Sequence, residues 1–137
     1  MIRSFFDSQE WKYRQYAEDS IESFMLGFTG LNEKILFRVD VMPNHDMYQI
    51  IGQSKTIVPV SNIERAIKAI NRYNLRAKVV SGCIGEDGAI TFWMGRNTDG
   101  DTFSEKAFGC DFDMVMREAD TATAQIFKEA LTAIEEE

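Results

Sequence analysis

Residues 61–94 limit the possible folds of this chain more than any other stretch of the sequence. The first half of this segment is typical of a helix with one buried face, because apolar residues recur every three or four positions. These residues are Ile63, Ala66, Ile67, Ile70 and Tyr73. The second half has alternating apolar and polar residues on either side of a Gly-Glu-Asp-Gly turn, which predicts a β-hairpin. A helix followed by a hairpin favours an α+β fold.

Polar residues predict how this helix begins and ends. Ser61 and Glu64 have the spacing of a capping box, in which each side chain accepts a hydrogen bond from the backbone N–H of the other residue. Asn74 follows the last apolar position and suits the left-handed conformation that ends many helices. The helix is therefore expected to run from Ser61 to Asn74.

The N-terminal half of the chain predicts a sheet. A short helix is expected before residue 9, and residues 11–14 fit either a strand or a continuation of that helix. Alternation of apolar and polar residues predicts strand at 24–28, 35–41, 47–51 and 56–58. Short polar connections join antiparallel neighbours, so we expect a twisted antiparallel β-sheet meander with one face covered by helices.

A long amphipathic helix is expected to cross that sheet at the C-terminal end, from about residue 111 to 134. Its apolar stripe comprises Phe112, Val115, Met116, Ala119, Ala122, Ile126, Ala130, Leu131 and Ile134. The acidic stretch 95–109 before it is expected to be a loop. Within this loop, Asp99, Asp101 and Glu105 are candidate ligands of a weakly bound cation or small molecule, although their spacing does not match an EF-hand.

The composition is that of one globular domain, here expected to span residues 1–137. Apolar residues make up 45% of the chain and ten residues are phenylalanine, so folding has to bury a core. No stretch has the length and character of a signal peptide or a membrane span, so we expect a cytoplasmic protein. The net charge is −7, with three basic against eleven acidic residues after position 98, which disfavours nucleic-acid binding.

Candidate catalytic groups are few. His45 is the single histidine and falls in a predicted turn, and Cys83 and Cys110 do not form a CxxC motif. These residues do not supply the four ligands of a typical zinc site. The glycine patterns that bind phosphates are also missing from the sequence. We therefore expect neither enzyme activity nor a cofactor.

Five basic residues lie between positions 65 and 78, and three of them share one face of the predicted helix. Arg65, Lys68 and Arg72 follow one another at spacings of three and four. A solvated helix face is the simpler interpretation. The alternative is a docking face for an acidic partner, such as the acidic C-terminal third of a second copy, which would give a salt-sensitive homodimer.

The second half of the chain contains short motifs in a fixed order. A Val-Pro precedes the predicted helix, the helix ends in Asn-Arg-Tyr-Asn, and a strand, an Asp-Gly turn and a second strand follow. The residues that form these motifs are Val58, Pro59, Asn71, Arg72, Asn74, Gly82, Asp87 and Gly88. Their order resembles that of the YbjN family of bacterial proteins. The stretch 95–109 is longer than the loop expected after the last strand in that family.

The resemblance implies an α+β fold similar to that of type III secretion chaperones, in which dimers are common. The family is described as candidate regulators of sensory transduction without established catalytic residues. Together these inferences favour a cytoplasmic, non-enzymatic adaptor or chaperone-like protein that binds a protein or peptide partner and forms a homodimer. The alternative is a small-molecule or cation sensor that uses the 95–109 loop.

Overall fold

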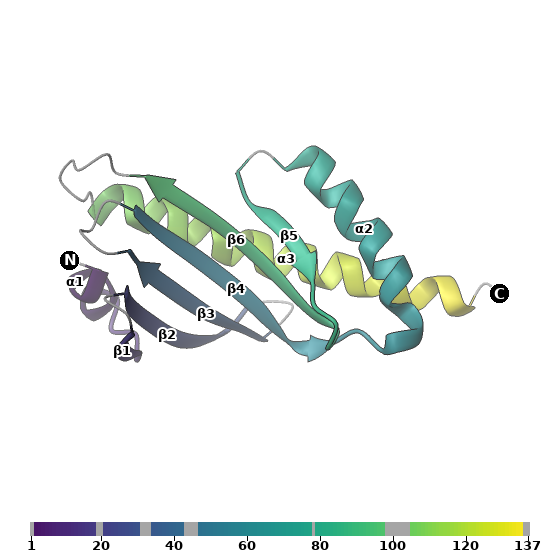
Figure 1. Ribbon diagram of the computed structural model, residues 1–137, viewed down its shortest axis with the longest axis horizontal. Helices are drawn as coiled ribbons and strands as arrows, with labels where there is room; N and C mark the ends of the chain where they lie inside the picture. The colour runs from purple at the N-terminus through teal and green to yellow at the C-terminus, as the bar shows by residue number, and fades with distance from the viewer. Residues whose placement is uncertain are drawn as a thin grey trace.

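The structure, a computed structural model, describes residues 2–18, 21–30, 34–42, 47–77, 79–97 and 105–135. These residues form one antiparallel sheet, three α-helices and one 3-10 turn (Figure 1). The strands are β1 (Arg14–Glu18), β2 (Ile21–Thr29), β3 (Lys34–Val41), β4 (Met47–Ile57), β5 (Ser81–Ile84) and β6 (Ala89–Asn97). The helices are α1 (Ile2–Ser8), α2 (Ile63–Arg76) and α3 (Glu105–Glu135), and the 3-10 turn is η2 (Val60–Asn62).

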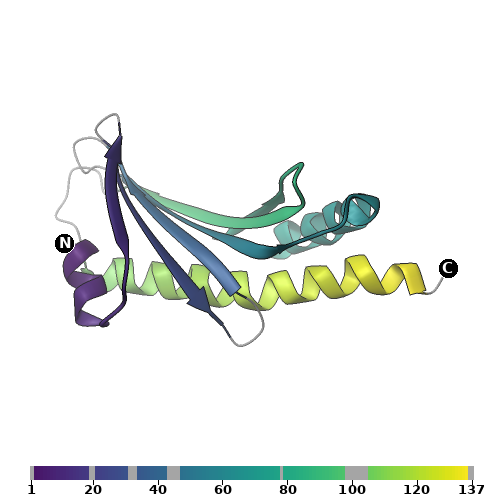
Figure 2. The same cartoon turned by 90° about the horizontal axis from the view of Figure 1, so that it is seen from below.

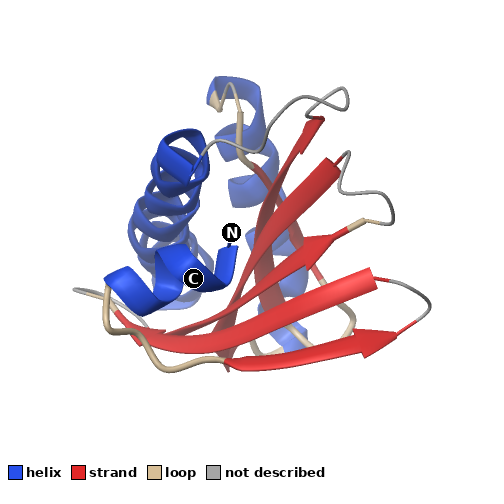
Figure 3. Cartoon of the chain, turned by 90° about the vertical axis from the view of Figure 1, so that its left-hand side faces the viewer, coloured by secondary structure: helices blue, strands red, loops and turns tan. Residues whose placement is uncertain are grey.

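The sheet has the strand order β1-β2-β3-β4-β6-β5, and every neighbouring pair is antiparallel. The first four strands form a meander, as expected, but the strands predicted separately at 47–51 and 56–58 are one continuous strand, β4. The chain then crosses through α2 before the β5–β6 hairpin returns beside β4. The described helices α1 and α3 lie on one side of the sheet (Figure 3), and α2 packs against β5 at the sheet edge and against α3. The predicted α+β architecture with a long C-terminal helix is therefore confirmed.

The core lies between the sheet and α3, which runs along the length of the sheet (Figure 2). Inward-facing residues of β3 are buried at every second position, as the alternation predicted: Ile35, Phe37, Val39 and Val41. Gly52 on β4 allows α3 to approach, because a Cβ there would lie 2.8 Å from Phe37 Cε1 and 3.4 Å from Ala119 Cβ. The predicted stripe on α3 is buried from Phe112 to Ala130 except for Met116, which is half-buried. Leu131 is 43% exposed, so its inclusion was wrong, and the side chain of Ile134 lies outside the described part of the structure.

Helix α1 docks on the core through aromatic rings. Phe6 is fully buried, and its ring centroid lies 5.9 Å from that of Phe24 on β2 and 5.6 Å from that of Phe112 on α3. Phe5 packs edge-on against Phe108, with 5.3 Å between the ring centroids. The first helix is thus fixed to both layers of the fold.

The start of α2 differs from the predicted capping box. Ser61 lies in η2 and donates from its Oγ to Asn62 Oδ1 at 2.9 Å, and no side chain caps the N-terminus of α2. Asn62 is buried instead, and its Nδ2 donates to the backbone oxygen of Ala130 at 3.0 Å. The helix start is therefore held by a bond to α3 rather than by a local cap.

The end of α2 also differs from the prediction. The helix continues to Arg76, so Asn74 is helical rather than left-handed. Its Nδ2 donates to the Gly82 oxygen at 3.0 Å, and its Oδ1 accepts from the Gly82 N–H at 2.8 Å. Because β5 is an edge strand, this amide occupies backbone groups that another strand could otherwise pair with.

The predicted loop at 95–109 is shorter than expected at both ends. Strand β6 continues to Asn97 and α3 begins at Glu105.

Among the described helices, none combines the length and the apolar character needed to cross a membrane.

Candidate functional site

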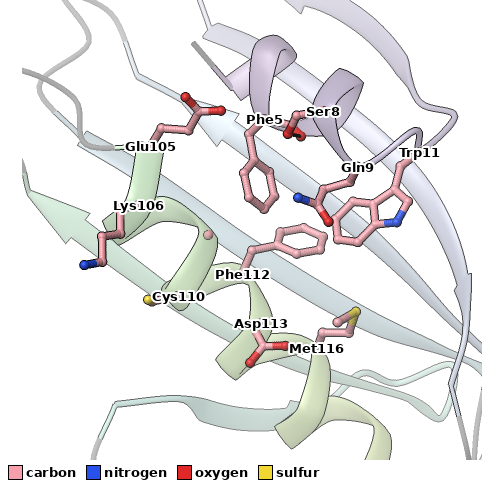
Figure 4. Close-up of a pocket in the computed structure, with 11 residues that line it drawn as sticks. Phe5, Ser8, Gln9, Trp11, Glu105, Lys106, Cys110, Phe112, Asp113 and Met116 are labelled. Atoms are coloured by element: carbon pink, nitrogen blue, oxygen red, sulfur yellow. Dashed lines mark hydrogen bonds between the residues drawn. The ribbon is translucent and has the colours of Figure 1, made fainter.

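A cleft of about 740 Å³ lies between α1 and the first turns of α3, hereafter the α1–α3 cleft (Figure 4). Figure 4 shows the Phe5 ring of α1 directed toward Phe112 of α3, with Trp11 beside both. The residues that line it are Phe5, Ser8, Gln9, Trp11, Glu105, Lys106, Gly109, Cys110, Phe112, Asp113 and Met116. A volume of this size is typical of ligand-binding sites.

A glycine on α3 sets the spacing of the two helices. A Cβ at Gly109 would lie 2.8 Å from Phe5 Cε2, so a larger residue would displace the Phe5 ring. Trp11 packs at 5.4 Å from Phe112 between ring centroids and at 5.9 Å from Phe5. The cleft is therefore walled by aromatic rings that the core holds from behind.

The lining of the α1–α3 cleft is apolar inside and charged at the edge. Phe5, Trp11 and Met116 are only half-buried, which leaves apolar surface open to a ligand. Glu105, Lys106 and Asp113 bring charges of both signs, and Asp113 also pairs with Arg117 Nη2 at 2.9 Å. This arrangement suits binding of an apolar group with polar flanks. Within the described ranges, no three residues of the metal-binding types come together as a metal site.

A buried polar network holds α3 on the sheet near the same end of the molecule. Asp111 is 2% exposed and receives bonds from Arg96 Nη2 at 2.7 Å and from Tyr48 Oη at 2.5 Å. Burial raises the pKa of Tyr48 above its ordinary value, and the hydrogen bond to Asp111 raises it further. The hydrogen bonds to Asp111 raise the pKa of Arg96, which stays charged. The network fixes the first turns of α3 that form one wall of the cleft.

The raised pKa of Tyr48 predicts a loss of stability at alkaline pH. Above about pH 10, Tyr48 in the unfolded chain loses its proton, whereas the folded chain keeps it. The folded state then binds more protons, so the free energy of unfolding falls as pH rises through this window. Tyr48→Phe is expected to make this decline shallower, as measured by urea unfolding between pH 8 and pH 11. Equal slopes for the variant and the wild type would contradict the prediction.

The basic residues predicted as a docking face lie on α2, away from the α1–α3 cleft. Arg72 Nη2 pairs with Glu129 Oε2 of α3 at 2.7 Å, and this hydrogen bond lowers the pKa of Glu129. Lys68 is exposed, and Arg65 is half-buried. Arg72 thus contributes to the contact between α2 and α3, and the role of the three residues in a homodimer stays a prediction.

The predicted cation or ligand loop is only partly described. Asp99 and Asp101 lie outside the described residues, as does His45. Glu105 is the first residue of α3 and lines the α1–α3 cleft. Cys110 is an exposed free thiol of the same cleft, and Cys83 is an exposed thiol of β5.

No family model and no curated protein matches the chain. Solved structures that share its fold include the following two. The crystal structure of YbjN from E. coli, described as a candidate transcription regulator, has a TM-score of 0.56 and 11% sequence identity over 96% of this chain and 90% of that chain. An uncharacterised protein from Methanothermobacter thermautotrophicus has a TM-score of 0.60 and 15% identity over 92% of this chain and 94% of that chain. These values show a YbjN-like fold, whereas membership of the family is not shown.

Proposed function

We propose that the chain is a non-enzymatic binding protein of the adaptor or chaperone-like type, which holds an apolar peptide segment of a partner protein in the α1–α3 cleft. The observation that carries this proposal is the open apolar interior of the cleft, with Phe5, Trp11 and Met116 half-buried and charged residues at the edge. Peptide segments that alternate apolar and polar side chains match such a lining.

The similarity of fold supports a regulatory role over a catalytic one. Of the two structures named above, one belongs to a candidate transcription regulator, and neither is described as an enzyme. Among the described residues that line the cleft there is a thiol but no histidine to act as its base, which disfavours a cysteine hydrolase. A cytoplasmic location and a homodimer remain proposals from the sequence.

A charge placed inside the cleft is expected to abolish peptide binding. Peptides selected from a display library on the immobilised protein should bind Met116→Lys at least about tenfold more weakly than the wild type, because the ammonium removes apolar contact and costs desolvation. Gln125→Lys is the matched control, since Gln125 is an exposed residue of α3 that does not line the cleft. Equal affinity of the wild type and Met116→Lys for the selected peptides would overturn the proposal.

A small-molecule or cation sensor is the second candidate function. The observation in its favour is that Glu105, one of the predicted ligands, lines the α1–α3 cleft. A thermal-shift screen with divalent cations and small metabolites distinguishes the two functions. A stabilisation that is lost in Glu105→Gln, with no peptide recovered from the library, would favour the sensor.

A further inference from the structure

A second hollow, of about 440 Å³, lies on the face of the sheet opposite α3. Its floor is formed by outward-facing residues of two neighbouring strands, Met25 and Gly27 of β2 and Leu36 of β3. Lys12 and Tyr13 line it from the segment before β1, and Arg14 lines it as the first residue of β1. Leu26 of β2 completes the lining. This hollow, hereafter the Gly27 hollow, shares no lining residue with the α1–α3 cleft.

Gly27 has no structural explanation in the folded chain. Glycine weakens a strand, because it loses more backbone entropy on folding than other residues and adds no side-chain contact. Among the eight glycines that the structure describes, Gly27 alone has no atom within 4 Å of the position of an added Cβ. Its backbone is also outside the left-handed region. What the glycine does provide is open space above the strand, which is what a ligand site requires.

The charge around the Gly27 hollow is opposite to that of the protein. Lys12 and Arg14 are the only charged residues in its lining, and both are exposed. Neither forms an ion pair with another described residue. The chain as a whole carries a net charge of −7, whereas the lining of this hollow carries two positive charges and no negative one. The hollow is therefore expected to attract an anion.

We propose that the Gly27 hollow binds an apolar monocarboxylate, a hydrocarbon or aromatic tail that ends in one carboxylate. The tail packs on Met25, Gly27 and Leu36, and the carboxylate meets the charges of Lys12 and Arg14. The volume of the hollow, about 440 Å³, is within the range of small-molecule sites and has room for such a tail. This site is independent of the peptide-binding role proposed for the α1–α3 cleft.

Three probes with defined chemistry test this proposal on the full chain. Octanoate, octylamine and N-acetyl-leucine are titrated at low ionic strength while amide shifts are followed by ¹H–¹⁵N NMR. Octanoate is expected to shift the amides of Lys12, Arg14 and Gly27, and octylamine to bind at least about tenfold more weakly because its charge is repelled. Shifts confined to residues that line the α1–α3 cleft, or no shifts at millimolar octanoate, would overturn the proposal.

A substitution that fills the Gly27 hollow is the most direct test of the proposal. Gly27→Val is expected to lose octanoate binding by at least about tenfold with an unfolding temperature equal to or above that of the wild type, because the new side chain enters open space. Thr29→Val is the matched control, since Thr29 is an exposed residue of the same strand and face that does not line the hollow. Octanoate binding to Gly27→Val with wild-type affinity would overturn the proposal.

A double substitution and the other two probes distinguish the contribution of the carboxylate from that of the apolar tail. Lys12→Gln combined with Arg14→Gln is expected to bring the affinities for octanoate and octylamine close together, because the charge discrimination resides in these two residues. Octylamine binding as strongly as octanoate to the wild type would contradict a carboxylate site. N-acetyl-leucine binding in place of octanoate would instead identify a peptide C-terminus as the occupant and overturn the assignment to a hydrocarbon acid.

Discussion

Replacing Phe6 with alanine is expected to lower the free energy of unfolding by about 3 to 5 kcal/mol, the cost of removing a fully buried aromatic side chain. Phe6 has no exposed surface and contacts rings on both layers of the fold, including Phe24 of β2 and Phe112 of α3. The cavity cannot collapse easily, because each neighbouring ring is itself held by a strand or helix. Urea unfolding followed by tryptophan fluorescence measures the change.

The same substitution is expected to weaken peptide binding in the α1–α3 cleft. Phe6 does not line the cleft, so a loss of affinity would report that α1 has moved from α3. Phe5→Ala provides the comparison, because Phe5 lines the cleft and is only half-buried. We expect it to cost about 1 to 2 kcal/mol of stability. A loss below about 1 kcal/mol in Phe6→Ala would show that docking of α1 contributes little to the fold.

The strands and the long helix were predictable from the sequence because their burial follows a local period. Along β3, a side chain at every second position faces α3, so the alternation at Ile35, Phe37, Val39 and Val41 was sufficient to identify both the strand and its buried face. On α3, spacings of three and four identified most of the buried residues in the same way. Leu131 is 43% exposed although the preceding residue, Ala130, is fully buried, so the stripe predicted from spacing alone was too wide at this point.

The α1–α3 cleft was not predictable, because its two walls are about a hundred positions apart in the chain. Phe5 was expected on a short helix, but nothing local indicates that the ring rests on Gly109. Gly109 itself was assigned to a loop, since glycine disfavours a helix interior. The one local signal is its spacing. Gly109 lies four residues after Glu105 and three before Phe112, so on a helix these residues share one face, and a glycine on that face can indicate a close helix contact. The long-range bonds of Asn62 and Asn74 escaped prediction for the same reason.

The last prediction concerns the turn that sets the position of α2. Gly88 has a φ of +88°, in the region that side chains other than glycine disfavour, and a Cβ there would lie 2.3 Å from the backbone oxygen of Val58. Gly88→Ala is expected to lower the free energy of unfolding by about 3 kcal/mol. Roughly half of this comes from the backbone conformation and half from a contact that no side-chain rotation can relieve.

Gly85→Ala in the same turn is the matched control. Its Cβ would lie 2.7 Å from Asp87 Oδ1, which is the end of a side chain that can rotate away, so we expect a cost below about 1 kcal/mol. Comparable losses in thermal and urea unfolding for the two variants would contradict this explanation. The Val58 N–H also donates to the backbone oxygen of Gly88 at 2.8 Å, and the chain enters η2 and α2 just after Val58. The Gly88→Ala variant is therefore also expected to increase amide exchange at the start of α2. The hairpin that closes the sheet therefore also fixes the helix that precedes it.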